Sequence, residues 1–331
     1  MNGKQRETFS SRIGFLLISA GCAVGLGNVW RFPYIVGQYG GAAFVLLYLI
    51  CLAILGVPIL VMEFAVGRAS RASTATAFSI LRPDKPGWQA FGYVSMITNY
   101  LLMMFYTTIA GWMCHYLVKM LMGGFSGKDP QQVTAAFGEM VASPATLCGW
   151  MIFVVLLGMF ICSRGLQNGV EKITKPMMTF LFVALPGAAE GLKFYLKPDF
   201  QALLSDRFGE ALFAAMGQAF FTLSIGAGSM TIFGSYIGKD HTLVGEAVRV
   251  ALLDTVVAFL AGLVIFPICS AFSVAPDSGP NLVFVTLPNI FNTMPLGRLW
   301  GSLFFVFMLF AALSTVVAVF ENIISFAIDR W

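Results

Sequence analysis

Long apolar stretches separated by short polar connections recur along almost the whole chain. About 20 apolar residues are needed for a helix to cross the hydrocarbon of a bilayer. The pattern predicts eight spans, at 13–36, 42–67, 90–122, 148–163, 176–186, 211–237, 245–273 and 298–328. The fifth is defective, because its roughly ten apolar residues make about 15 Å of helix, half a bilayer. We therefore predict an all-α polytopic membrane protein.

The connections add one more element. The segment 280–292 is apolar but too short to span, so we expect a re-entrant or capping helix on the outer side. Composition supports the membrane assignment: 58% of residues are hydrophobic and 11% are charged, whereas soluble domains carry about 25% charged residues.

Orientation follows from the basic residues, which favour cytoplasmic loops. Thirteen of the 20 Lys and Arg residues lie at the N-terminus or in connections on the same side as it, and seven lie on the other side. We therefore expect a multi-pass cell-membrane protein with a cytoplasmic N-terminus. The chain has no Asn-x-Ser/Thr sequon, which favours a bacterial inner membrane.

Two spans contain glycine-rich interruptions. Residues 21–28 (GCAVGLGN) and 222–229 (TLSIGAGS) would both weaken a helix. Either stretch alone could be a close helix–helix contact. Interruptions in the first and sixth spans together favour a transporter site, because unwound backbone can bind ions and substrate there. The link between paired interrupted spans and transport sites was established in part on transporters with motifs like those of this chain.

Other functional classes lack support in the sequence. The basic residues are dispersed, which argues against a nucleic-acid partner. The six cysteines are scattered singly, and the chain has only two histidines. Catalysis would need a clustered nucleophile, base or metal set. We therefore expect neither an enzyme nor an organic cofactor.

Four segments carry a specific resemblance. They are GLGNVWRFPY at 25–34, GQAFFTLSIGAG at 217–228, APDSGPNLVFVTLPNIF at 275–291 and FAALST at 310–315. In this order the chain resembles the neurotransmitter:sodium symporter family, in its bacterial, leucine-transporter-like branch. The resemblance implies a leucine-transporter-type inverted repeat with broken helices 1 and 6. One transporter domain would cover 1–331, with a first repeat at 13–186 and a partial second repeat, lacking later spans, at 211–331.

The resemblance also implies the activity: sodium-coupled symport of a hydrophobic or aromatic amino acid by alternating access within a lipid bilayer. Two Na⁺ sites are expected. The first would comprise Ala23, Asn28, Thr222 and Asp254, completed by the substrate carboxylate. The second would comprise Gly21, Val24, Ala311, Ser314 and Thr315. Hard oxygen ligands of this kind suit a small hard cation.

The implied substrate site lies between these ions. Its residues would be Ala23, Leu26, Gly27, Leu102, Tyr106, Phe221, Ser224, Ala227, Val316 and Val319. The lining is apolar, and Ala227 stands where the leucine transporter has Phe. A larger pocket would favour an aromatic substrate, with Phe221 as its lid.

The resemblance also assigns gates and an anion site. Arg31 would be the outer-gate arginine, and Arg6 with Asp329 the inner pair, with Tyr236 nearby. Tyr48 and Gln218 look like the remnant of a chloride site. Many family members have Asn where this chain has Asp254, a residue within an apolar span that is a functional candidate by default. We expect Asp254 to supply the negative charge, which makes transport chloride-independent.

Two alternatives stay open at this point. One is a proton-coupled amino-acid permease on the same scaffold, in which a titratable group replaces the second sodium. The other is a non-transporting fragment that binds substrate. The sequence alone does not fix the exact amino acid, the sodium stoichiometry or the oligomeric state.

Overall fold

The computed structural model describes residues 25–164, 188–204, 206–238, 240–271 and 279–330. These stretches are almost wholly helical, and their one isolated β-bridge joins Gly41 to Pro198. The all-α prediction is confirmed for this part of the chain. The predicted fifth span and residues 13–24 of the first lie outside it.

Five helices among the described residues are long and apolar enough to cross a membrane. They correspond to the second, third, fourth, seventh and eighth predicted spans. Their elements are α3 (Ala42–Cys51), which continues through η2 (Leu52–Gly56) into α4 (Val57–Ser70), then α6 (Pro86–Leu121), α8 (Pro144–Arg164), α14 (Leu243–Ala271) and α16 (Gly297–Arg330).

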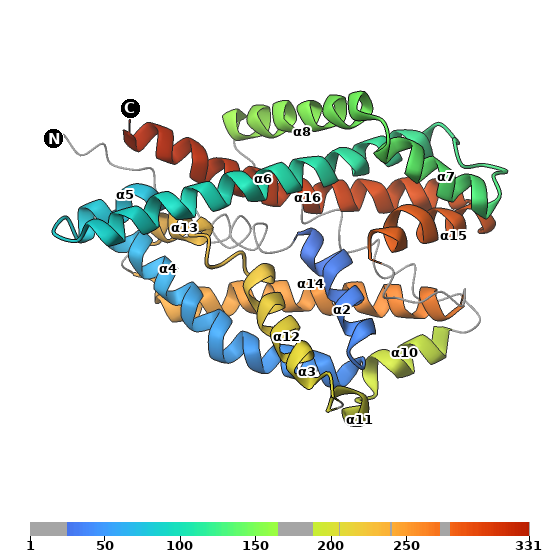
Figure 1. Ribbon diagram of the computed structural model, residues 1–331, viewed down its shortest axis with the longest axis horizontal. Helices are drawn as coiled ribbons and strands as arrows, with labels where there is room; N and C mark the ends of the chain where they lie inside the picture. The colour runs from blue at the N-terminus through green and yellow to red at the C-terminus, as the bar shows by residue number, and fades with distance from the viewer. Residues whose placement is uncertain (1–24, 165–187, 205, 239, 272–278, 331) are drawn as a thin grey trace.

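The sixth span is broken, as its glycines predict. It consists of α12 (Phe208–Thr222) and α13 (Ser229–Tyr236), separated by six non-helical residues. The described half of the first span consists of η1 (Gly27–Arg31), a π-helical turn, followed by α2 (Phe32–Gln38). In Figure 1, α2 and α12 cross α14 near the middle of the molecule, on the side of α6 away from α8.

Shorter helices gather at the two ends (Figure 1). One end carries α7 (Pro130–Val141), α10 (Ala188–Leu196), α11 (Phe200–Leu203), η3 (Leu282–Thr286) and α15 (Leu287–Thr293). The other end carries α5 (Thr74–Leu81) and the last turns of α16. The helix predicted at 280–292 is confirmed. By contrast, α7 falls where only a connection was expected, and Asp129 and Gln132 form a reciprocal capping box at its start.

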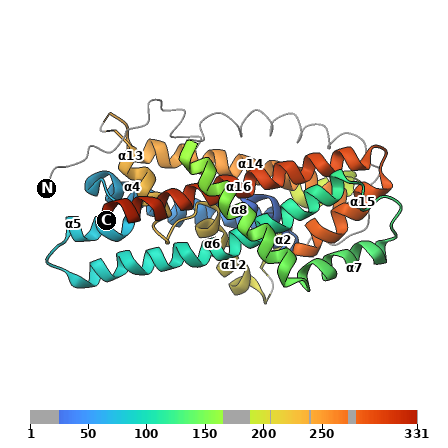
Figure 2. The same cartoon turned by 90° about the horizontal axis from the view of Figure 1, so that it is seen from above.

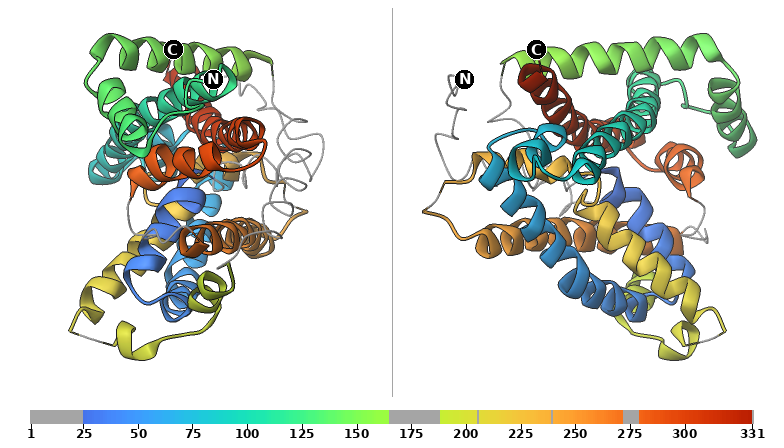
Figure 3. Two further views of the ribbon diagram at one scale, coloured as in Figure 1. Left: turned by 90° about the vertical axis from the view of Figure 1, so that its right-hand side faces the viewer. Right: turned by 60° about the vertical axis from the view of Figure 1, so that its left-hand side comes forward.

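The long helices are arranged in two hydrophobic clusters. The first is built mainly from α6, α7, α8, α15 and α16, and the second from α2, α3, α4, α12, α13 and α14. Figure 3 shows α8 at the outer edge of the first cluster, beyond α6 and α16. Seen from above, α6, α14 and α16 run along the long axis (Figure 2).

The first span joins the two clusters. Leu26 and Val29 are buried in the first, whereas Phe32, Ile35 and Val36 are buried in the second. The polar and interrupted segments therefore lie at the seam between two separately packed groups of helices.

Candidate functional site

The interruption of the sixth span is a segment of unusual backbone. Ser224, Gly226 and Gly228 have φ angles of 52°, 89° and 72°. These values lie in the left-handed region, which glycine adopts at little cost. At Gly228 an added Cβ would also lie 2.4 Å from the Cγ2 atom of Thr74. The glycine-rich sequence therefore produces this break directly.

Side chains from three other helices satisfy the broken backbone. The Glu63 carboxylate on α4 accepts hydrogen bonds from the amides of Gly226 (2.6 Å) and Met230 (3.2 Å). The Thr74 hydroxyl donates to the Gly228 carbonyl, and the Asn99 carboxamide donates to the Ala227 carbonyl at 2.8 Å. Non-helical backbone at membrane depth requires such partners.

Three residues of the predicted first sodium site meet beside the sixth-span break. The Asn28 amide donates to Asp254 Oδ1 at 2.7 Å and to the Asp254 carbonyl at 3.0 Å. The Thr222 hydroxyl donates to Asp254 Oδ2 at 2.7 Å and lies 3.3 Å from Asn28 Oδ1. Asn28 comes from the first span, Thr222 from the sixth and Asp254 from α14, and each is at most 1% exposed.

This cluster fits a small cation. Its available ligands are oxygen atoms, the kind that hard cations prefer. None of the ion pairs between described residues involves Asp254. A buried carboxylate without a cationic partner is costly, and a bound ion would remove that cost. Ala23, the fourth predicted member, lies outside the described residues.

Three of the five residues of the predicted second sodium site belong to the described part of the chain. On α16 the Ser314 hydroxyl donates to the Ala311 carbonyl at 2.9 Å, and Thr315 is fully buried. Gly25 lies against this helix, since a Cβ added to it would be 2.6 Å from Thr315 Oγ1. The first span therefore approaches α16 where the resemblance places the site. Gly21 and Val24 lie outside the described residues.

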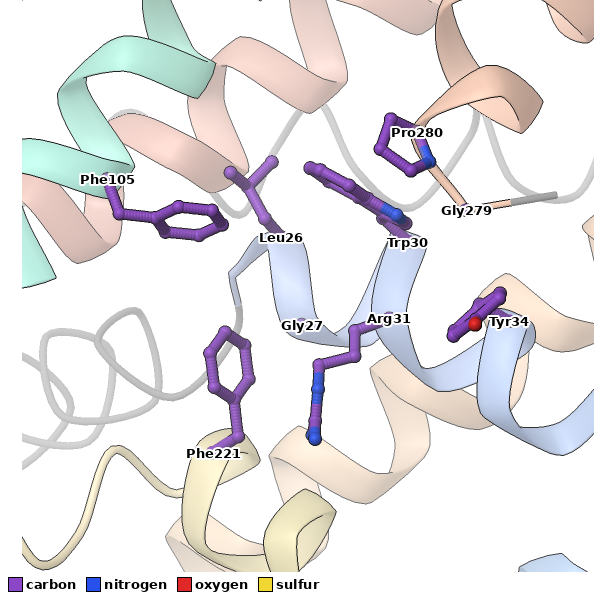
Figure 4. Close-up of a pocket in the computed structure, with 9 residues that line it drawn as sticks. All are labelled: Leu26, Gly27, Trp30, Arg31, Tyr34, Phe105, Phe221, Gly279 and Pro280. Atoms are coloured by element: carbon purple, nitrogen blue, oxygen red, sulfur yellow. The ribbon is translucent and has the colours of Figure 1, made fainter. Parts of the chain in front are cut away.

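A cavity of about 490 Å³ lies beside η1 (Figure 4). Its lining residues are Leu26, Gly27, Trp30, Arg31, Tyr34, Phe105, Phe221, Gly279 and Pro280. Phe221 forms its floor and stacks on Tyr106, with the ring centroids 6.5 Å apart. The Arg31 guanidinium lies 4.9 Å from the Phe221 ring and donates to Gln218 Oε1 at 2.5 Å.

The predicted substrate residues that the structure describes, all but Ala23, lie in three places. Leu26, Gly27 and Phe221 line this cavity. Four others lie in or against the first hydrophobic cluster: Leu102, Tyr106, Val316 and Val319. The last two, Ser224 and Ala227, lie in the sixth-span break. The cavity therefore includes only part of the predicted substrate site.

The two residues predicted as the remnant of an anion site are buried. Tyr48 and Gln218 are both 0% exposed, and the Tyr48 side chain lies near Thr222 and Asp254. One turn after Asp254, Ala258 offers no polar group and is fully buried. The carboxylate is thus the one anionic group among these residues.

At the opposite end, two of the residues predicted for the inner gate have contacts with described residues of neighbouring helices. Tyr236 donates to Glu321 at 2.8 Å, a pairing that sequence reasoning did not identify. Asp329 accepts from the Ser73 amide at 2.6 Å and from the Thr76 hydroxyl at 3.0 Å. These bonds connect α16 to α5 and α13. Arg6 lies outside the described residues.

Sequence reasoning also missed residues that this geometry brings forward. Trp30, Tyr34 and Phe105 line the outer cavity. Asn99 supports the sixth-span break and also accepts from the Ser229 hydroxyl at 2.6 Å. An asparagine in the middle of an apolar span was an available signal, because buried polar groups in membranes need partners.

Two clusters of membrane helices, with a broken helix and a buried oxygen-rich site at their seam, define a multi-pass membrane transporter. The sequence model of the Sodium:neurotransmitter symporter family matches residues 6–126 and 135–331. The chain belongs to this family. Its members are sodium-dependent transporters rather than enzymes.

Bacterial relatives agree with this assignment. An uncharacterized sodium-dependent transporter of Haemophilus influenzae is 34% identical over 98% of this chain and 74% of its own length. The uncharacterized sodium-dependent transporter YhdH of Bacillus subtilis is 35% identical over 98% of this chain and 73% of its own length. The chain thus spans about three quarters of each relative.

The fold also matches a solved transporter. The crystal structure of MhsT in complex with L-phenylalanine superimposes with a TM-score of 0.86 at 38% sequence identity. The match covers 98% of this chain and 76% of that one. The predicted fold, a leucine-transporter-type arrangement with broken helices, is confirmed.

Proposed function

We propose that the protein couples the inward movement of Na⁺ to that of a hydrophobic or aromatic amino acid, by alternating access and without chloride. The observation that carries the proposal is the contact of Asn28 and Thr222 with the buried Asp254 carboxylate. This contact joins the two interrupted spans to α14, where a cation would hold all three together.

Coupling follows from the position of this site. Asn28 is one residue from Gly27, whose backbone lines the outer cavity. A substrate carboxylate bound at the Leu26 and Gly27 amides would reach a sodium ion beside Asn28 and complete its ligand set. Ion and amino acid would then share a bond, so that each raises the affinity for the other.

The character of the outer cavity supports an apolar substrate. Aromatic and aliphatic side chains from η1, α6 and α12 surround it (Figure 4). The related transporter MhsT was solved with L-phenylalanine. We therefore take phenylalanine as the first amino acid to test, with its ring lying in the cavity against Phe221.

The two hydrophobic clusters are suited to alternating access. They meet at the site and are separately packed, so that one can rock against the other. We assign the cavity, which Arg31 and Pro280 line, to the outer side, with the N-terminus in the cytoplasm. The side chains of Asn99 and Ser229, beside the sixth-span break, are fully buried.

A proton-coupled mechanism is the second candidate, because Asp254 is a buried group that could bind a proton. The two candidates are separated by driving force. Uptake driven by an inward sodium gradient at equal pH supports the symporter, whereas uptake driven by a pH gradient in potassium alone supports the permease.

Binding provides the simplest test of the proposal. Radiolabelled phenylalanine, tyrosine and leucine would be equilibrated with the detergent-purified protein in sodium and in potassium. We expect saturable binding of at least one of them in sodium only. Equal binding in both salts contradicts a shared ion–substrate site. Sodium-dependent binding without uptake would identify a substrate-binding fragment.

A further inference from the structure

One buried amide in α16 lacks the partners that its depth requires. Asn322 is 0% exposed, and neither its carboxamide oxygen nor its nitrogen has a hydrogen-bond partner among the described residues. In a membrane protein a polar side chain in this situation is costly to keep, and such groups mark ion and substrate pathways.

The position of Asn322 on its helix is the second observation. Residues spaced by three, four or seven positions share a helix face. Four polar residues of α16 follow this spacing: Thr315, Asn322, Ser325 and Asp329. The small Ala311 and Ala318 lie on the same face. All but Asp329 are at most 5% exposed. The face is therefore polar and buried from the second predicted sodium site to the Asp329 end.

The neighbouring helix contributes polar atoms at the same depth. Tyr116 packs on Phe305 and Tyr93 on Phe326, with centroids 5.4 and 6.3 Å apart, so α6 and α16 run antiparallel. This register places Asn322 level with Asn99, and Ser325 level with Ser95. Ser95 is 2% exposed, and its hydroxyl has no hydrogen-bond partner in the described ranges.

We propose that this face of α16, with Ser95 opposite it, forms the route by which Na⁺ leaves the second site for the cytoplasm, with the Asn322 carboxamide oxygen as a transient ligand. The inference rests on the proposed function. Amide, hydroxyl and carboxylate oxygens suit a sodium ion, and the route ends at the Asp329 carboxylate. When the cytoplasmic side opens, water and the sodium ion bind to the Asn322 carboxamide. When that side closes, they leave, and the carboxamide is again buried without a partner among the described residues.

The first test compares Asn322→Leu with the wild-type chain and with Ile323→Leu, a substitution at the neighbouring core position. The Asn322→Leu substitution removes a buried, unpaired oxygen and nitrogen and keeps the branched shape of the side chain. It is therefore expected to raise the melting temperature. Sodium-dependent phenylalanine binding should stay within twofold of wild type, while net uptake falls at least fivefold. Asn322→Thr, which restores an oxygen, should recover at least half of the rate.

Wild-type uptake by Asn322→Leu overturns the proposal, as does a parallel loss of binding and uptake, which would indicate a structural role. Failure of the wild-type chain to bind any of phenylalanine, tyrosine and leucine with sodium would instead refute the proposed function, and it is seen before any variant is compared.

A second measurement does not depend on uptake. Asn322→Cys in a background lacking the six native cysteines would be treated with a hydrophilic methanethiosulfonate reagent. We expect labelling in potassium and protection in sodium, with Ile323→Cys unlabelled in both. No labelling of Asn322→Cys in either salt would show that water never reaches this position, and the route would be rejected.

Discussion

At the scale of single residues, the account depends most on Asp254. Its carboxylate is fully buried and is held by Asn28 and Thr222. Replacing it by Asn keeps the shape and removes the charge that would face a sodium ion. We predict that Asp254→Asn weakens the apparent sodium affinity at least tenfold, about 1.4 kcal/mol. Sodium titration of phenylalanine binding measures this.

The matched control is Asp84→Asn, in an exposed connection where Asp84 pairs with Arg82. It should leave the sodium titration unchanged. An unchanged sodium affinity in Asp254→Asn would remove Asp254 from the ion site.

Gly25 gives a steric prediction at the same scale. An added Cβ would lie 2.6 Å from Thr315 Oγ1 and 3.2 Å from the Tyr106 hydroxyl. Overpacking of this kind costs about 1–3 kcal/mol. Gly25→Ala should therefore separate the first span from α16 and weaken sodium-dependent binding at least tenfold. Gly138→Ala, where an added Cβ meets no atom within 4 Å, is the control. Equal binding by the two variants would contradict the close approach.

At the scale of elements, the break between α12 and α13 depends on Glu63. Its carboxylate accepts from two backbone amides, and Glu63→Gln would turn one acceptor into a donor facing them. A hydrogen bond to a charged group contributes about 1.5–3 kcal/mol. We predict a melting temperature several degrees lower, measured in the same detergent. The exposed Glu139→Gln should melt like wild type, and equal melting of both variants would show that the break needs no carboxylate.

The helices that were predictable from sequence are those with a strong apolar or glycine signal. The break at 222–229 was predictable because three of its residues need a left-handed backbone, and two of those are Gly226 and Gly228. The helix α7 was missed, because twelve residues of mixed polarity give no span signal. Asp129, Pro130 and Gln132 nevertheless form a recognisable helix start.

Among the site residues, too, some contacts were predictable from the sequence and others were not. Asn28, Thr222 and Asp254 could be placed together because the family pattern assigns them one ion. The pairings of Tyr236 with Glu321 and of Arg31 with Gln218 could not, because they depend on how far helices from distant parts of the sequence are rotated against each other. Periodicity identifies the buried face of a helix but not the partner that faces it.

At the scale of the whole molecule, the buried negative charge predicts anion requirements. Asp254 lies beside Tyr48, where the resemblance places a chloride site in related proteins. A second anion there would be repelled by the carboxylate. Replacing chloride by gluconate should therefore leave sodium-driven uptake unchanged, measured as an initial rate in proteoliposomes. A loss of more than half of the rate would show that chloride, and not Asp254, supplies the charge.

The account's central claim is that the two hydrophobic clusters move against each other to carry Na⁺ and an amino acid together. Sodium-driven accumulation of phenylalanine in proteoliposomes tests this central claim most directly. We predict that an inward sodium gradient concentrates radiolabelled phenylalanine above its external level, and that collapsing the gradient releases it. Equilibration to the external level, with or without sodium, would contradict coupled transport.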